Sequence, residues 1–147
     1  MFQINNLFNN KNIQCVSQMG QFFVCEHQKD LSVSPYNAET AYFSSEMNVK
    51  RRQVLVQLNN TGCFIQAGAM QWMLGNVNMK TNVTAGNFLG KAASAMVTKE
   101  TIAKPEYTGQ GYLMLEPTYK HIILIDVSKW GQIVLDDGLF LAWDNTL

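Results

Sequence analysis

The side chains that could bind a metal ion are few and widely separated. The two histidines, His27 and His121, lie far apart in the chain, whereas metal-dependent enzymes hold their ion with clustered histidines and a carboxylate. The three cysteines are odd in number and form no CxxC pair, so they match neither a zinc site nor a disulfide framework. We therefore expect no metal and no cofactor, and free thiols in a reducing compartment.

Groups suited to acid–base or nucleophilic catalysis are equally sparse. Asp136 and Asp137 precede Gly138 in an expected tight turn, where an aspartate caps its own backbone and needs no raised pKa. No motif places a histidine beside a cysteine, and no serine lies in a GxSxG elbow. The sequence therefore favours a protein that is not an enzyme, with no catalytic residue to name.

Phosphate and nucleic-acid binding have little support. Residues 86–91, GNFLGK, combine glycines with a lysine but lack the GxxxxGK[ST] pattern of a phosphate loop. Eleven basic residues balance eleven acidic ones, and the one dense positive cluster, residues 50–52, fits a solvated turn. Without a basic stripe, RNA binding is only a weak alternative.

The remaining candidates are apolar side chains. The chain is rich in methionine and aromatic residues, and methionine suits both irregular cores and adaptable contact surfaces. We expect most of these side chains in the core. Trp72, Met73 and Trp143 lie at the ends of expected strands, and tryptophan is enriched in interfaces. These three residues form the predicted interaction surface.

Two stretches of the chain look alike and must position these side chains. The first is residues 53–77 and the second is residues 122–147. Each contains an apolar run, a polar turn ending in glycine, a second apolar run, a glycine, and a third run carrying tryptophan. Such self-similarity predicts a repeated structural unit. We expect a first β repeat over residues 1–83, a helical connector over 84–104 and a second β repeat over 105–147.

Short apolar runs bounded by turn residues predict strands in both copies. The β-branched run at 54–58 is followed by a turn at 59–62, whose residues tolerate left-handed or turn geometry, and Gly68 marks a bend or bulge. Residues 13–16 and 21–26 read as a hairpin. In the second copy the predicted strands are residues 121–127, 133–135 and 139–143, where consecutive apolar positions require cover on both faces.

Helical character is confined to one stretch. The alanine-rich residues 86–97 are the single predicted helix, whereas residues 41–47 read as a strand or an irregular return. With 147 residues, 47% of them apolar and 15% charged, the chain can fill a core. The predicted fold class is all-β: an antiparallel β-sandwich or short double-stranded β-helix in tandem pseudo-symmetric repeats, with one short helix between them.

Several motifs together resemble the altered-inheritance-of-mitochondria family. The resemblance runs from about residue 54 to the C-terminus. The motifs are GCFIQAGAM at 62–70, NFLGKA at 87–92, KPEYTGQG at 104–111, LEP at 115–117 and DDGLFLA at 136–142. The family implies a β fold similar to that of the tryptophan RNA-binding attenuation protein, usually in three repeats around a pseudo-threefold axis. This chain is expected to carry two.

The missing repeat has a physical consequence. Strand edges and apolar faces that a third repeat would cover are left exposed, and exposed edges pair with other chains. The chain is therefore expected to self-associate, unless it is a fragment of something longer. The family implies no established enzymatic activity, and its mitochondrial members are linked to organisation of the inner membrane.

We expect a cytoplasmic, bacterial member of this family, because the N-terminus shows no signal peptide or presequence and no apolar run is long enough to cross a bilayer. The expected function is that of a non-enzymatic, self-associating β module, a scaffold or assembly protein. It would form homo-oligomers, and its other protein partners are unknown. The alternative is a binder of a small apolar or aromatic ligand between the repeats.

Overall fold

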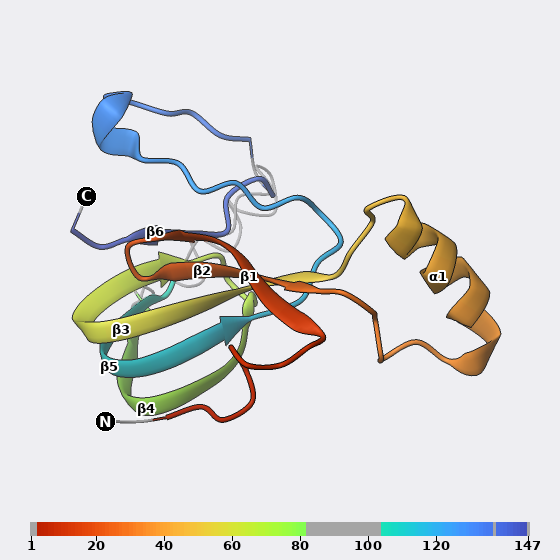
Figure 1. Cartoon of the computed structure of the whole chain (residues 1–147). Helices are drawn as coiled ribbons and strands as arrows, with labels where there is room; N and C mark the ends of the chain where they lie inside the picture. The colour runs from red at the N-terminus through yellow and green to blue at the C-terminus, as the bar shows by residue number, and fades with distance from the viewer. Residues whose placement is uncertain (1–2, 82–103, 137, 147) are drawn as a thin grey trace, which may run out of the picture.

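The chain folds mainly as one antiparallel β-sheet, which confirms the predicted all-β class (Figure 1). The computed structural model describes residues 3–81, 104–136 and 138–146. The strand order is β1-β2-β3-β5-β4, and β6 pairs with β3. The elements are β1 (Ile13–Met19), β2 (Phe22–His27), the 3-10 turn η1 (Pro35–Asn37), α1 (Ala38–Glu46), β3 (Arg52–Ile65), β4 (Met70–Lys80), β5 (Glu106–Leu115), the 3-10 turn η3 (Val127–Lys129) and β6 (Ala142–Asp144).

The predicted turn after Leu58 is instead a β-bulge inside one long strand, β3. The register of β3 against β5 shifts between Asn59 and Thr61, and Asn60 adopts a φ of 54°. The extra residue reverses the alternation of faces, so Leu58 before the bulge and Cys63 after it enter the same core. The predicted tolerance of residues 59–62 for left-handed geometry is confirmed at Asn60, but these residues bend the strand and do not end it.

Strand β5 is strongly curled. It separates β3 from β4, which run parallel to each other, yet the connection between them is only residues 66–69. A straight strand as long as β5 spans roughly 30 Å, whereas this connection reaches roughly 17 Å. The two ends of β5 must therefore approach each other, and Tyr107 and Leu115 from those ends enter one core cluster. Figure 1 shows the curved wall made by β3, β5 and β4.

Aligned glycines permit this curl. Gly111 on β5 lies opposite Gly75 on β4, and Gly109 lies two positions away with a φ of 132°. A Cβ atom on Gly111 would overlap the backbone oxygen of Leu74, and one on Gly109 would overlap that of Asn76. Neither oxygen can withdraw without disturbing the β4–β5 ladder, so both positions require glycine.

The sheet buries apolar side chains on both of its faces. The larger cluster consists of Val54, Val56, Leu58, Cys63, Ile65, Tyr107, Leu113 and Leu115. The smaller cluster consists of Leu7, Cys25, Leu55 and Met114. Ile4 and Ile13 pack against this second cluster, so the N-terminal segment covers part of the second face. The predicted hairpin is confirmed as β1 and β2, and it extends the sheet beyond β3.

One edge of β3 is shared by two short neighbours. β2 pairs with its first residues and β6 with its last, and the side chain of Gln21 lies between them. Gln21 Nε2 donates to the backbone oxygen of Gly62 at 2.8 Å and to Oδ2 of Asp144 at 3.2 Å. Its Oε1 accepts from the Thr61 hydroxyl at 2.5 Å. This amide joins the N-terminal hairpin to the C-terminal strand.

Among the described residues between 121 and 141, no strand forms that would match β3 or β4. The strands predicted at residues 121–127 and 133–135 were wrong, and of the strand predicted at 139–143 only the C-terminal part falls in β6. Strands need a partner edge. β2, β5 and β6 between them already occupy both edges of β3, and residues 121–135 do not pair with the outer edge of β4. The tandem repeat is therefore not confirmed by the described residues.

The interpretation of residues 41–47 as a strand or irregular return was also wrong. Most of this stretch belongs to α1, which follows Pro35 at the start of η1. The helix buries no residue and projects from the sheet on two extended segments (Figure 1). We call residues 28–49 the helical arm. The helix predicted at residues 86–97 lies outside the described residues.

Candidate functional site

The predicted interface residues on β4 point to opposite faces of the strand. Trp72 lies opposite Met114 and packs against the cluster that contains Leu55, so its indole is half-buried in the core. Met73 is the next residue along the strand and is 48% exposed. The two side chains therefore do not form one continuous patch. A Trp72 substitution would disturb the fold as well as any interface.

Trp143 lies on β6, within an aromatic cluster. Its ring centroid is 5.4 Å from that of Phe64 and 4.7 Å from that of Phe140. The Lys104 ammonium lies 5.0 Å from the centre of the Trp143 ring and 4.5 Å from that of Phe140, within cation–π range. These contacts attach β6 to the end of β3, and they leave Trp143 38% exposed.

A longer apolar surface follows β5, and the sequence analysis did not identify it. We call residues 122–136 the C-terminal apolar segment. Six of its large apolar side chains are exposed: Ile123, Ile125, Trp130, Ile133, Val134 and Leu135. The sequence predicts that these same residues are covered on both faces. Among the described residues, only Ile122 of the segment packs against the larger core cluster, so most of that cover is not provided by this part of the chain.

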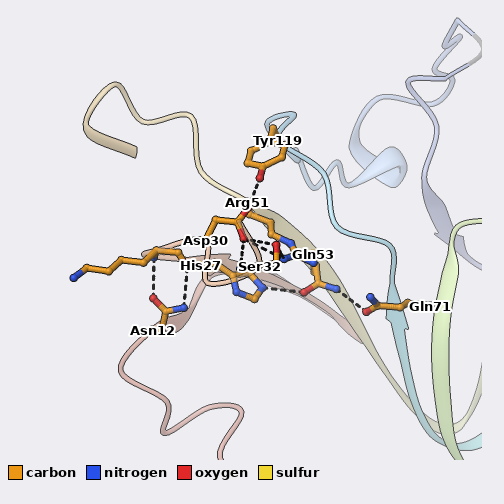
Figure 2. A network of polar contacts seen from close by, with 9 residues as sticks. Asn12, His27, Asp30, Ser32, Arg51, Gln53, Gln71 and Tyr119 are labelled. Carbon is orange, nitrogen blue, oxygen red and sulfur yellow. Dashed lines mark hydrogen bonds and ion pairs between the residues drawn. The ribbon is translucent and has the colours of Figure 1, made fainter. Parts of the chain in front are cut away.

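A chain of polar side chains runs along the base of the helical arm (Figure 2). Gln53 Nε2 donates to the backbone oxygen of Leu115 at 3.1 Å and to Oε1 of Gln71 at 2.9 Å. A backbone oxygen can only accept, so Oε1 of Gln53 faces His27 at 2.8 Å. His27 Nε2 is therefore the donor, and its Nδ1 is left for other partners.

Asp30 connects the arm to the loop that follows β5 (Figure 2). It accepts hydrogen bonds from the Ser32 backbone and hydroxyl, from the Tyr119 hydroxyl and from Arg51 Nη1. Burial raises the pKa of Asp30, but the hydrogen bonds from Ser32 and Tyr119, with the Arg51 charge, outweigh it and hold that pKa well below its usual range. The hydrogen bond to Asp30 in turn raises the pKa of Tyr119.

The positive cluster at residues 50–52 is not the solvated turn that was predicted. Arg52 contacts one carboxylate oxygen of Glu26 through Nε at 3.0 Å and Nη2 at 2.8 Å, and its side chain is only 6% exposed. Lys50 lies 3.3 Å from the other oxygen of Glu26. Arg51 pairs with Asp30 at 3.3 Å. These ion pairs hold the two ends of the arm together.

The three thiols have different environments. Cys15 is exposed, whereas Cys25 and Cys63 are buried. Burial, with the neighbouring Cys15, raises the pKa of Cys25 to about 11. Burial, with the nearby carboxylates of Asp144 and Glu106, raises the pKa of Cys63 to about 12. Of the three thiols, only Cys15 is exposed.

Alkylation is therefore expected to be selective. Iodoacetamide at pH 8 should add one group, at Cys15, because a thiolate is the reactive species and the other two thiols stay protonated and covered. Intact mass and peptide mapping measure the adducts. The same treatment in denaturant should modify all three cysteines, and equal labelling of Cys63 in the folded protein would contradict the expectation.

Among residues 3–81, 104–136 and 138–146, no group of three or more histidine, cysteine, aspartate or glutamate side chains could hold a metal ion. None of the helices within those ranges has the length and apolar character needed to span a membrane.

Comparison with known proteins places the chain in a family. No curated protein and no solved structure matches it. A family model described as "Mitochondrial biogenesis AIM24" matches residues 43–147, which include β3, β4, β5 and β6 together with the C-terminal apolar segment. The resemblance found in the sequence motifs is thereby confirmed, and the match covers most of the chain. The chain belongs to the AIM24 family.

Proposed function

We propose that the protein is a non-enzymatic β module that associates with further copies of itself and serves as a scaffold or assembly unit. The observation that carries this proposal is the C-terminal apolar segment. Val134 is 85% exposed, Ile123 77% and Trp130 75%, within a stretch of only fifteen residues. Apolar surface gains roughly 25 cal/mol for each Å² removed from water, so contact with a partner is favourable.

The edge of β4 supports the same proposal. Among the described residues, β4 pairs with β5 alone, and its outer edge presents unpaired backbone groups. The strand has eleven residues and contains no proline. Its one charged side chain, Lys80, and its one register shift, between Met70 and Trp72, lie at its two ends. Edge strands in monomeric proteins are usually protected by charges, prolines or bulges at several positions. β4 therefore suits pairing with another chain.

A second copy of the chain is the partner that these surfaces fit. The formal net charge is zero, so two copies do not repel each other electrostatically. A two-fold interface places the same patch on both subunits, and a long apolar segment can meet itself across such an axis. Both surfaces lie within the region matched by the family model.

Charge placed in the segment is expected to dissociate the assembly. The wild-type mass in solution should exceed that of the monomer, and the double variant Ile123→Lys/Val134→Lys should weaken association at least tenfold, because it buries two unpaired ammonium groups. Sedimentation velocity over a concentration series measures this shift.

The matched control is Leu31→Lys, which adds a charge at an apolar residue that is 78% exposed but lies in the helical arm. It should leave the mass unchanged. A wild-type protein that stays monomeric at all concentrations would refute the proposal. If Leu31→Lys dissociated the assembly equally, the effect would not be specific to the C-terminal apolar segment.

A further inference from the structure

A cleft separates the helical arm from the strand ends at its base. Its volume is about 340 Å³, within the range of small-ligand sites. The arm supplies Ala41 and Ser44 on one side, and the strand ends supply His27 and Arg51 on the other. Tyr119 from the loop after β5 adds a further wall. Such a space holds roughly ten water-sized groups.

The one carboxylate that lines this cleft, Asp30, is already occupied. Asp30 Oδ1 accepts from Ser32 and from Arg51, and its Oδ2 accepts from the Tyr119 hydroxyl. The carboxylate is thereby satisfied by its own chain. A ligand that carries a positive charge would therefore find no free carboxylate among the lining residues.

Donors, in contrast, remain available. Arg51 uses Nη1 for Asp30 and Ser32, while its Nε and Nη2 have no partner among the described residues. The Ser44 hydroxyl also has no partner within that part of the chain, and its residue lines the cleft. Two cationic side chains, Lys50 and Arg51, line the cleft against one carboxylate, Asp30. The local charge therefore favours an anion.

From these observations we infer that the cleft binds a small organic carboxylate with a compact apolar body. The free edge of the Arg51 guanidinium receives the carboxylate, since its planar donors match two oxygens. The apolar body contacts Ala41, Val49 and the Tyr119 ring. This site lies in the helical arm, so it is independent of association through the C-terminal apolar segment.

Binding is tested with benzoate and hexanoate as probes, one with an aromatic body and one with a linear body. Titration of the ¹⁵N-labelled protein should shift the Arg51 Nε resonance and the backbone amides of the cleft. Benzamide, which has the same shape as benzoate without the charge, should bind at least tenfold more weakly. If neither carboxylate moves these resonances at millimolar concentration, the inference is overturned.

Two variants separate charge from shape. Arg51→Gln should weaken benzoate binding at least tenfold, whereas Lys129→Gln, which removes an exposed charge outside the cleft, should leave it unchanged. Ala41→Leu fills the cleft and keeps every charge, so it should also abolish binding. This second variant tests the site even if Arg51→Gln disturbs the arm. Thermal unfolding checks that each variant is folded. Unchanged binding in either cleft variant would overturn the assignment.

Discussion

Gly111→Ala is expected to lower the free energy of unfolding by roughly 3 kcal/mol or more. The new methyl group would overlap the Leu74 backbone oxygen, and it would also crowd Gly75 on the neighbouring strand. Relief requires β4 to move away from β5, which breaks ladder hydrogen bonds between the two strands. Against a total stability of roughly 5–15 kcal/mol, this loss is large.

The matched control is Gly131→Ala. Gly131 has a φ of 74° and no atom within 4 Å of an added Cβ, so only the backbone conformation is penalised, by about 1–2 kcal/mol. Urea unfolding followed by circular dichroism measures both variants. If Gly111→Ala were no more destabilising than Gly131→Ala, the glycines would not be the cause of the curl.

Local patterns predicted the strands near the N-terminus and the centre of the chain. The hairpin of β1 and β2 follows from two apolar runs around Gly20, and the run at 54–58 belongs to β3 as expected. Residues 59–62 were predicted to tolerate left-handed or turn geometry, and Asn60 adopts a positive φ. Whether such a residue ends a strand or bends it depends on the neighbouring strand, because β5 continues past the bulge and holds both halves of β3.

The C-terminal part shows the limit of apolar patterns. Residues 122–125 are consecutive apolar residues and read as a buried strand, yet Ile123 is largely exposed. A run of this kind indicates only that the side chains favour an apolar environment. It does not indicate whether the same chain or a partner provides that environment. The self-similarity with residues 53–77 therefore reflects composition and turn spacing, and it did not predict secondary structure.

The hydrogen bonds and ion pairs of the candidate site could not be predicted from the sequence, because they join residues that are far apart in the chain. Asp30 and Tyr119 meet although they are far apart in the chain, and no motif connects them. Arg52 was read as part of a solvated cluster, because charged residues are usually exposed. Its burial depends on Glu26, which lies opposite it on the neighbouring strand β2.

Glu26→Gln is expected to destabilise the protein by about 3 kcal/mol, because it leaves the Arg52 guanidinium buried without a compensating charge. Glu26 is only 12% exposed and receives both Arg52 Nε and Nη2, with Lys50 close by. Arg52 also donates to the backbone oxygens of Lys50 and Asn48, so loss of its anchor would release the end of the helical arm. Urea unfolding measures the change in stability.

A double-mutant cycle isolates the ion pair. The cycle comprises Glu26→Leu, Arg52→Met and the double variant Glu26→Leu/Arg52→Met, which removes both charges. The double variant should be more stable than Glu26→Leu alone, with a coupling energy of at least about 1 kcal/mol between the two positions. The control is Lys129→Gln, which breaks a pair whose lysine is 76% exposed and should change stability by less than about 0.5 kcal/mol. Additive effects at positions 26 and 52 would show that the two side chains do not stabilise the arm as a pair.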